Sequence, residues 1–365
     1  MKVERRSVRA PLYSLCIPQH NRTSFVIEVC RSLAAQQFRD FELCVSDDCS
    51  TDGRQQDLLD YLETSGLSFV YRRLERNGRY DVNLRSAIEL ASGEYCFLLG
   101  NDDVLKDAAT LTQLHQAIDC HPRPAVVFTN FEDFATGTVT RRVKSTRTIG
   151  SGPSAAVGCF RKFSFVSGVL LHRASAQRIA TKRWDGSEMY QMFVGCRLIA
   201  EGGLLLEVDQ VTVRKDLQLV GEAVNSYATE NRRPERGIPP QRIPLVQTAR
   251  LVLDAVSPYL QRQRLRPVLS VLIQYFGFLY PYWLFEYRRV QSWRYAAGVA
   301  RAMLPRHSLG DAEVSALERA CASITYGVAT VIGFVLPLWL VRGLHPPARR
   351  IARYVGDFAM TTSRS

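Results

Sequence analysis

Apolar residues in the first 130 positions follow two alternating patterns, which predict strands and helices in turn. Short uninterrupted apolar runs have the length of buried strands, and the segments between them carry apolar residues at helical spacing. The strands are expected at 12–18, 41–46, 67–74, 94–100 and 125–130, and the helices at 23–36, 55–64, 80–91 and 105–120. Strands separated by helices of this length predict an α/β fold with a Rossmann-like, mostly parallel sheet flanked by helices.

Adjacent carboxylates follow two of the expected strands. Asp102 and Asp103 come after the strand at 94–100, and Asp47 and Asp48 follow an earlier strand. The carboxyl ends of parallel strands form the edge at which open α/β sheets bind ligands. Asp and Asn are also common in turns that bind nothing, so the pattern alone leaves both interpretations open.

The turn after the first strand excludes two common nucleotide-binding motifs. Its sequence, PQHNRTS, contains no glycine, whereas the dinucleotide fingerprint G-x-G-x-x-G and the P-loop G-x-x-x-x-G-K-[ST] both need glycines near the phosphates. Carboxylates at this edge would repel a diphosphate unless a hard divalent cation lay between them. A nucleotide-diphosphate ligand would therefore require Mg²⁺ or Mn²⁺.

Several segments, in order along the chain, resemble glycosyltransferase family 2, whose members have the GT-A fold. They are IPQHNR at 17–22, SLAAQQFRDFELCVSDDCSTDG at 32–53 and NGRYDVNLRSAIELASGEYCFLLGNDDVL at 77–105. The resemblance covers residues 12–215 and is strongest up to residue 106. It implies an inverting, metal-dependent transfer of a sugar from a nucleotide-diphosphate donor to an acceptor hydroxyl, without a covalent intermediate.

The resemblance also implies site residues at the two strand ends. In the family, an Asp pair after the second strand contacts the nucleobase and ribose, and a D-x-D element holds the metal and the diphosphate. The D-x-D element maps onto residues 100–102, with Gly100 in place of the first acid. The implied donor contacts are Asp47, Asp48 and Asn101, and the implied metal ligands are Asp102 and Asp103.

Two further asparagines are candidates for donor binding. Asn83 falls where relatives often carry Asn in the helix before the metal-binding strand, and a solvated helix position is the alternative. Asn77 lies in the arginine-rich segment 72–79, RRLERNGR. The guanidinium fork suits phosphate oxygens, although a basic loop is more often simply solvated.

Inverting transfer needs a carboxylate that takes the proton of the acceptor hydroxyl. Glu188 is the preferred candidate, because Ser187 is expected to begin a helix whose first turn would direct Glu188 toward the crevice. An acidic residue in a first turn also simply suits the helix dipole. Asp185, after Trp184, is the competing candidate.

Charge and cysteine content restrict the partners and the compartment. The formal net charge of +12 suggests a polyanionic partner, but no basic helix with interleaved aromatic residues supports nucleic acid. The nine cysteines form no C-x-x-C pair and no Cys/His cluster. This pattern argues for a reducing compartment without a disulfide framework.

Two long uncharged runs, 268–285 and 321–341, lie in the last third of the chain. Each approaches the roughly 20 residues that span a bilayer, but spanning would place arginines on the disfavoured side in either orientation. Helices lying in the interface keep every arginine beside anionic lipid. We therefore expect a peripheral or monotopic protein at the cytoplasmic face of the inner membrane; a spanning hairpin and a soluble helical core are the alternatives.

The expected organisation is a GT-A catalytic domain at 1–215, a loop or linker at 216–250, and a helical membrane-associating region at 251–365. The expected function is sugar transfer to a lipid-linked saccharide in surface-polysaccharide synthesis of the O-antigen type. Two alternatives stay open: a nucleotidyltransferase, and a non-catalytic nucleotide-sugar-binding protein with a decayed site, which Gly100 suggests.

Overall fold

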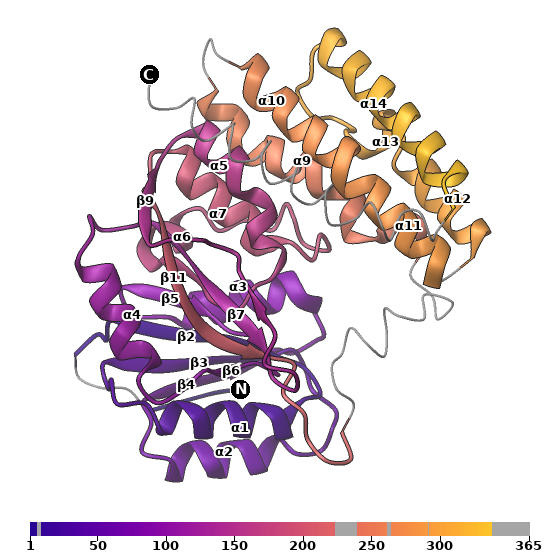
Figure 1. Ribbon diagram of the computed structural model, residues 1–365. Coiled ribbons are helices and arrows are strands. Elements are labelled where there is room, and N and C mark those ends of the chain that lie inside the picture. Colours follow the sequence, from indigo (N-terminus) through magenta and orange to yellow (C-terminus); the bar gives the residue numbers. More distant parts are fainter. Residues whose placement is uncertain (6–8, 223–238, 261–263, 291, 338–365) are drawn as a thin grey trace. The chain divides into compact units, whose positions relative to one another are not determined.

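The chain forms two compact units, as the computed structural model in Figure 1 shows. The structure describes residues 1–5, 9–222, 239–260, 264–290 and 292–337. The first unit contains Met1–Gly150 and Arg161–Asn225, and the second contains Ser151–Phe160 and Ser226–Ser365. The domain expected at 1–215 thus overlaps the first unit, except that a short segment before residue 161 belongs to the second.

The first unit is built on one mixed, 11-stranded sheet. Its strands are β1 (Lys2–Arg5), β2 (Tyr13–Gln19), β3 (Phe41–Asp47), β4 (Phe69–Arg73), β5 (Tyr95–Leu98), β6 (Val104–Leu105), β7 (Val126–Asp133), β8 (Val139–Thr140), β9 (Arg147–Gly150), β10 (Val169–His172) and β11 (Leu205–Lys215). They are ordered β1-β4-β3-β2-β5-β10-β7-β11-β6, with β8 beside β7 and β9 beside β11. The expected α/β sheet is confirmed: β4, β3, β2 and β5 are parallel. Beyond them β10 enters antiparallel between β5 and β7, so the second half is mixed.

Helices cover both faces of this sheet. They are α1 (Thr23–Ala34), α2 (Gln55–Thr64), α3 (Arg79–Leu90), α4 (Thr110–Asp119), α6 (Arg173–Arg178) and α7 (Tyr190–Ala200), together with the 3₁₀ turn η1 (Phe160–Ser164). Figure 1 shows α1 and α2 on one side of the sheet and α3 on the other. Strands β2 and β3 are buried along their whole length, because parallel strands covered on both sides meet no water.

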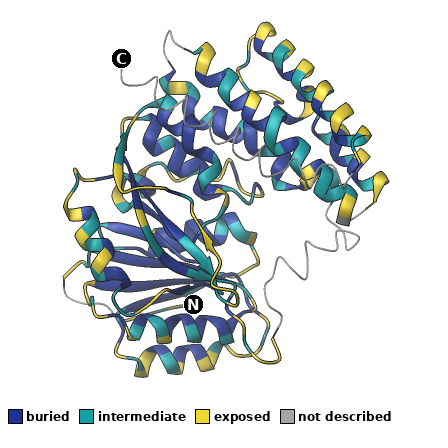
Figure 2. Ribbon diagram, in the orientation of Figure 1, coloured by how far each residue is buried: buried dark blue, intermediate teal, exposed yellow. Residues whose placement is uncertain are grey.

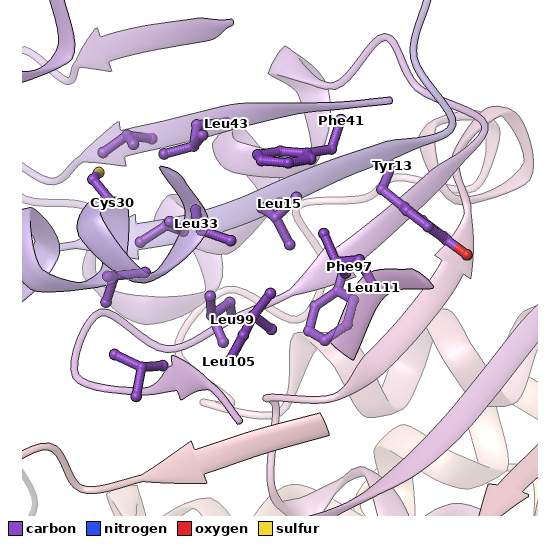
Figure 3. Packing of buried hydrophobic residues seen from close by; sticks show 14 of the residues in the cluster. Tyr13, Leu15, Cys30, Leu33, Phe41, Leu43, Phe97, Leu99, Leu105 and Leu111 are labelled. Atoms are coloured by element: carbon purple, nitrogen blue, oxygen red, sulfur yellow. The ribbon is translucent and has the colours of Figure 1, made fainter. Parts of the chain in front are cut away.

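One hydrophobic core joins the sheet to α1, α2 and α4. In Figure 3, Leu33 of α1 and Leu111 of α4 lie with Leu15, Leu43 and Phe97 of the strands. The residues of α1 recur at helical spacing, so its apolar side faces the sheet. Helix α3 is different, because its buried residues include several polar ones.

The second unit is helical. Its elements are α5 (Pro153–Cys159), η3 (Pro240–Arg242), α9 (Pro244–Val256), η4 (Ser257–Tyr259), α10 (Leu265–Leu272), the π-helical turn η6 (Ile273–Leu279), α11 (Tyr280–Val290), α12 (Trp293–Ala302), α13 (Pro305–Ser308) and α14 (Ala316–Val335). The linker expected at 216–250 is wrong at its end, because α9 begins at Pro244. Proline suits the first helical position, and the apolar residues that follow it are buried at helical spacing.

The apolar run expected at 268–285 lies inside the continuous helical stretch Leu265–Arg289. Among the described residues this is the one helix whose length and composition would suffice to cross a bilayer, and 50% of its most apolar window is buried within the protein. Val268, Tyr275 and Tyr280 have no exposed surface. The protein thus buries half of this window, and the expected contact of the run with the membrane interface stays a prediction. The second run enters α14, and its last residues, 338–341, lie outside the described residues.

Candidate active site

The strand ends of the parallel half bring most of the predicted residues to one edge. In the register of β2 and β3, Gln19 lies opposite Asp47. The Nδ2 atom of Asn101, in the turn after β5, donates to Oε1 of Gln19 at 3.2 Å. The carboxyl ends of β2, β3 and β5 therefore form one polar edge. This is the edge at which the sequence predicts a ligand site in an open α/β sheet.

Asp47 and Asp48 are both buried, and both carboxylates are engaged within the protein. Asp47 accepts the backbone N–H of Ser50 at 2.8 Å and the hydroxyl of Tyr71 at 2.5 Å. Asp48 accepts the N–H of Gly78 at 2.6 Å, and burial raises the pKa of its carboxyl. Asp47 thus shapes the turn after β3, and the nucleotide contacts assigned to the pair stay a prediction.

Asn77 lies beside His20, a residue of the turn after β2. The Nδ2 atom of Asn77 and Nε2 of His20 are 3.3 Å apart, and Nδ1 of the same ring is 2.9 Å from the backbone oxygen of Asp48. The segment around Asn77 therefore closes over the Asp48 turn.

Asp102 forms an ion pair with Arg22. Nη2 of Arg22 lies 3.1 Å from Oδ2 of Asp102, and the two side chains are 8% and 16% exposed. The guanidinium also stacks over the ring of Phe25, at 3.7 Å from the centroid. Burial raises the pKa of Asp102, and Arg22 opposes that shift. The residue predicted to bind a cation therefore already faces one supplied by the chain.

Asp103 points into the protein and anchors the turn. It accepts hydrogen bonds from the hydroxyl of Ser167 and from the backbone N–H of Asp216, the latter at 3.0 Å. Burial, followed by the neighbouring Asp102, raises its pKa to about 7. A Cβ at residue 100 would come within 2.8 Å of Oδ2 of Asp103. This contact explains why Gly100 stands where the family has its first acid.

The donor set fits a divalent cation through Asp102 better than through Asp103. Among the described residues, no three or more Asp, Glu, His or Cys side chains are grouped to hold a metal ion. Asp102 keeps some exposure, whereas both oxygens of Asp103 already accept hydrogen bonds. A cation here would depend on oxygens of a bound diphosphate to complete its shell, as Mg²⁺ commonly does.

Asn83, on α3, is buried and not solvated. Its Nδ2 donates to the backbone oxygen of Gln19 at 2.9 Å, which ties α3 to the end of β2. Its Oδ1 is buried without a hydrogen-bond partner among the described residues. Buried polar atoms are normally paired, so this oxygen is a candidate acceptor for a ligand hydroxyl.

The turn that carries Glu188 is held by Asp81, also on α3. The carboxylate of Asp81 accepts the backbone N–H of Glu188 at 2.8 Å and that of Tyr190 at 3.0 Å. Burial raises the pKa of Asp81 to about 6. Glu188 has φ of 56°, and α7 begins only at Tyr190. The expectation that Ser187 begins the helix, with Glu188 in its first turn, is therefore wrong.

Asp185, the competing base, is paired with Arg85 of α3. The two groups meet through both carboxylate oxygens, with Nη2 of Arg85 at 2.9 Å from Oδ2. Arg85 also donates to the backbone oxygen of Thr181 at 2.9 Å. A bidentate pair of this kind fixes the orientation of a carboxylate. The geometry favours Glu188 over Asp185 as the base, and this choice stays a prediction.

Sequence reasoning did not single out Asp81, Arg22 or Ser167. Arg22 and Asp81 lie within the segments that resemble the family, but nothing local distinguishes them from solvated residues. One feature of the sequence could have pointed to Asp81: the helix expected at 80–91 carries polar residues on its apolar side. Ser167 is distant in sequence from the residue it positions and offered no signal.

The fold is that of the GT-A-like glycosyltransferases. The structure of residues 1–349 of Staphylococcus aureus TarS in complex with UDP superposes with a TM-score of 0.58 at 16% identity, covering 88% of this chain and 90% of that one. The mannosyltransferase PcManGT from Pyrobaculum calidifontis, in complex with GDP-Man and Mn²⁺, gives 0.50 at 15% identity, covering 98% and 89%. At these identities the likeness concerns the fold alone.

Residues 14–182 match the family described as Glycosyl transferase family 2. Abequosyltransferase RfbV of Salmonella typhimurium is 36% identical over 107 residues, which is 28% of this chain and 32% of that protein. Poly(ribitol-phosphate) beta-N-acetylglucosaminyltransferase TarS of S. aureus is 33% identical over 113 residues, 29% of this chain and 19% of that protein. The matches thus span about a third or less of these relatives. The resemblance expected from the sequence is confirmed.

Proposed function

We propose that the chain is an inverting glycosyltransferase that moves a sugar from a nucleotide-diphosphate donor to an acceptor hydroxyl in bacterial surface-polysaccharide synthesis. The observation that carries this proposal is the edge where β2, β3 and β5 gather Asp47, Asn101 and Asp102 inside the matched family domain. Relatives named as an abequosyltransferase and as a poly(ribitol-phosphate) beta-N-acetylglucosaminyltransferase support it. So do neighbours solved with UDP and with GDP-Man.

In the proposed reaction the acceptor oxygen attacks the anomeric carbon of the donor sugar. The new bond forms as the bond from that carbon to the phosphate oxygen breaks, and the hydroxyl proton passes to the carboxylate of Glu188. The nucleoside diphosphate leaves with the electron pair, and the anomeric configuration inverts. Asp81 fixes the backbone of Glu188, so the base is positioned before the acceptor arrives.

The charge of the leaving diphosphate needs a positive counterpart. Arg22 supplies one at the edge, where it faces Asp102. A Mn²⁺ or Mg²⁺ ion held by Asp102 would add Lewis-acid stabilisation of the leaving group. The buried Oδ1 of Asn83 is a proposed acceptor for a hydroxyl of the donor.

The proposed acceptor is a lipid-linked saccharide at the cytoplasmic face of the inner membrane. Basic residues outnumber acidic ones in the carboxyl third, where residues 251–365 hold 14 arginines, no lysine and six acidic residues. Such a surplus favours a membrane that presents anionic lipid. A substrate screen would identify the nucleobase of the donor, the transferred sugar and the linkage that is formed.

The test is a screen of nucleotide-diphosphate sugars for hydrolysis and transfer, with and without Mn²⁺, on the full chain and on Asp102→Ala. We expect one donor to be turned over, and Asp102→Ala to lower the rate by roughly 10²–10³-fold because charge stabilisation is lost. Its melting temperature should fall, because the largely buried Arg22 loses the carboxylate that it faces.

Glu63→Ala, which removes an exposed carboxylate from α2, is the control and should change nothing. Near-normal turnover by Asp102→Ala at saturating donor would refute the assignment of Asp102. A product with retained anomeric configuration by NMR would refute the single-displacement reaction.

A further inference from the structure

Helix α14 exposes its large apolar residues to solvent. Six of them form what we call the outward stripe: Leu317 (61% exposed), Ile324 (68%), Val328 (57%), Val331 (61%), Ile332 (42%) and Val335 (72%). Their spacing places them along one side of a helix. Figure 2 shows exposed positions recurring along this helix.

The inward side of α14 is the more polar one. Glu318 is buried and completes a capping box with Ser315. Thr330 and the hydroxyl of Tyr280 lie 2.8 Å apart, and the hydroxyl of Tyr326 donates to the backbone oxygen of Ala300 at 2.8 Å. A helix on the surface of a soluble domain normally has the opposite arrangement, with its apolar stripe turned inward.

The stripe is long and uncharged. It extends over 317–335, about 27 Å at the helical rise per residue. The two charged residues of α14, Glu318 and Arg319, both lie in its first turn. Contiguous exposed apolar surface of this kind marks a contact with protein or with a membrane.

Aromatic and basic residues border the far end of the stripe. Trp293, 57% exposed, packs against Phe334 of α14 with ring centroids 5.2 Å apart. Arg288 lies over the ring of Trp293 at 4.5 Å and donates to the backbone oxygen of Leu336 at 3.1 Å. Trp283 of α11 is also partly exposed. Tryptophan and arginine beside an apolar surface are typical of the lipid headgroup region.

We propose that α14 lies in the plane of an anionic bilayer surface, with the outward stripe among the acyl chains and Trp283 and Trp293 at the headgroups. Residues 251–365 hold 14 arginines and six acidic residues, and their net positive charge suits an anionic surface. A spanning orientation would place the polar inward side of α14 at the centre of the bilayer.

This inference narrows the expectation from the sequence, which assigned both apolar runs to the membrane. Much of the run at 268–285 is buried in the helical unit, so the contact with the acyl chains is assigned to α14, and Trp283 is the residue of that run assigned to the headgroups. The inference does not rest on the proposed transferase activity. Its test therefore needs neither donor nor acceptor.

The experiment is co-sedimentation of the full chain with phosphatidylcholine vesicles that contain or lack phosphatidylglycerol. We expect wild type to bind the anionic vesicles, and high salt to weaken binding. Val328→Glu should lower the partition coefficient at least about tenfold, because a charge replaces a buried apolar group. Ser323→Glu is the matched control: Ser323 is exposed on the same helix but lies outside the stripe, and it should bind as wild type does.

Three outcomes would overturn the proposal. Equal binding by Val328→Glu and wild type would show that the stripe does not touch lipid. A wild-type dimer that becomes a monomer in Val328→Glu, by light scattering, would assign the stripe to a second copy. A melting temperature lowered by Val328→Glu and not by Ser323→Glu would mean that the chain itself covers the stripe.

Discussion

Helices α3 and α14 break the usual amphipathic rule in opposite directions. Helix α3 buries Asp81, Asn83 and Arg85 in the first unit, whereas α14 exposes a row of valines and isoleucines in the second. Burying polar groups costs free energy unless each finds a hydrogen-bond partner. Exposing apolar groups loses the stabilising free energy that their burial would contribute. Neither helix is therefore arranged for stability alone.

The difference between them identifies two kinds of function. Three buried polar residues of α3 each reach a different piece of the site: Asp81 the Glu188 turn, Asn83 the end of β2, and Arg85 the Asp185 loop. Helix α3 thus acts as a frame that sets several loops relative to one another. The outward stripe of α14 is largely exposed, and the partner that we propose for it is a membrane surface.

The largest effect should come from the residue that α3 holds in place. Glu188→Gln is expected to lower kcat roughly a hundredfold or more while donor affinity stays nearly unchanged, because a general base acts on the transition state. Steady-state kinetics with a donor titration measures both quantities. Asp185→Asn is the matched comparison. If it shows this pattern and Glu188→Gln does not, the two roles must be exchanged.

Asp81→Asn should have the next largest effect. Asn keeps one acceptor oxygen, but its amide N–H₂ would face the N–H of Glu188 or Tyr190. We expect kcat to fall about tenfold with little change in donor KM, because the base is displaced and not removed. Asp60→Asn, on the exposed side of α2, is the control. A change in donor KM alone would contradict a positioning role.

The same residue should give stability a pH dependence. Burial raises the pKa of Asp81 to about 6, against about 4 in an unfolded chain. Asp81 binds its proton more tightly in the folded state than in the unfolded state. Protonated Asp81 therefore adds to the free energy of unfolding; this addition is fully present below about pH 4 and is lost as pH rises through about 6. Urea unfolding at several pH values should show a smaller slope in Asp81→Asn than in wild type; part of the slope should remain, because the pKa of Asp103 is also raised.

The sequence predicted the parallel half of the sheet well, because those strands are apolar on both faces. Runs such as 41–46 admit few other structures, and helix α2 occupies 55–64 as expected. The antiparallel insertion of β10 could not be foreseen, because its neighbours β5 and β7 are chosen by tertiary packing.

The sequence predicted only those site residues that directly follow the parallel strands. Asp47, Asn101 and Asp102 end strands, so the topology brings them together. The position of Glu188 was missed because the group that holds its N–H comes from Asp81, on a separate helix. The substitution at Gly100 makes physical sense only with Asp103 folded against it.

The smallest effect should come from Val328→Ser on the outward stripe. Val328 is 57% exposed, so its truncation should change the free energy of unfolding by less than about 0.5 kcal/mol. Transfer to a water-soluble acceptor should also be unchanged. Ala329→Asp, one residue further but buried, should destabilise by about 2 kcal/mol or more, because a carboxylate would replace a packed methyl group.

Chemical denaturation of the two variants in the absence of lipid separates the faces of α14. If Val328→Ser lost as much stability as Ala329→Asp, the stripe would be part of the core, and α14 would obey the ordinary rule. If it loses almost nothing, the stripe contributes to no part of the fold. The comparison with α3 then holds in full, since every polar residue buried by α3 is expected to cost stability when removed, and the apolar residues exposed by α14 are not.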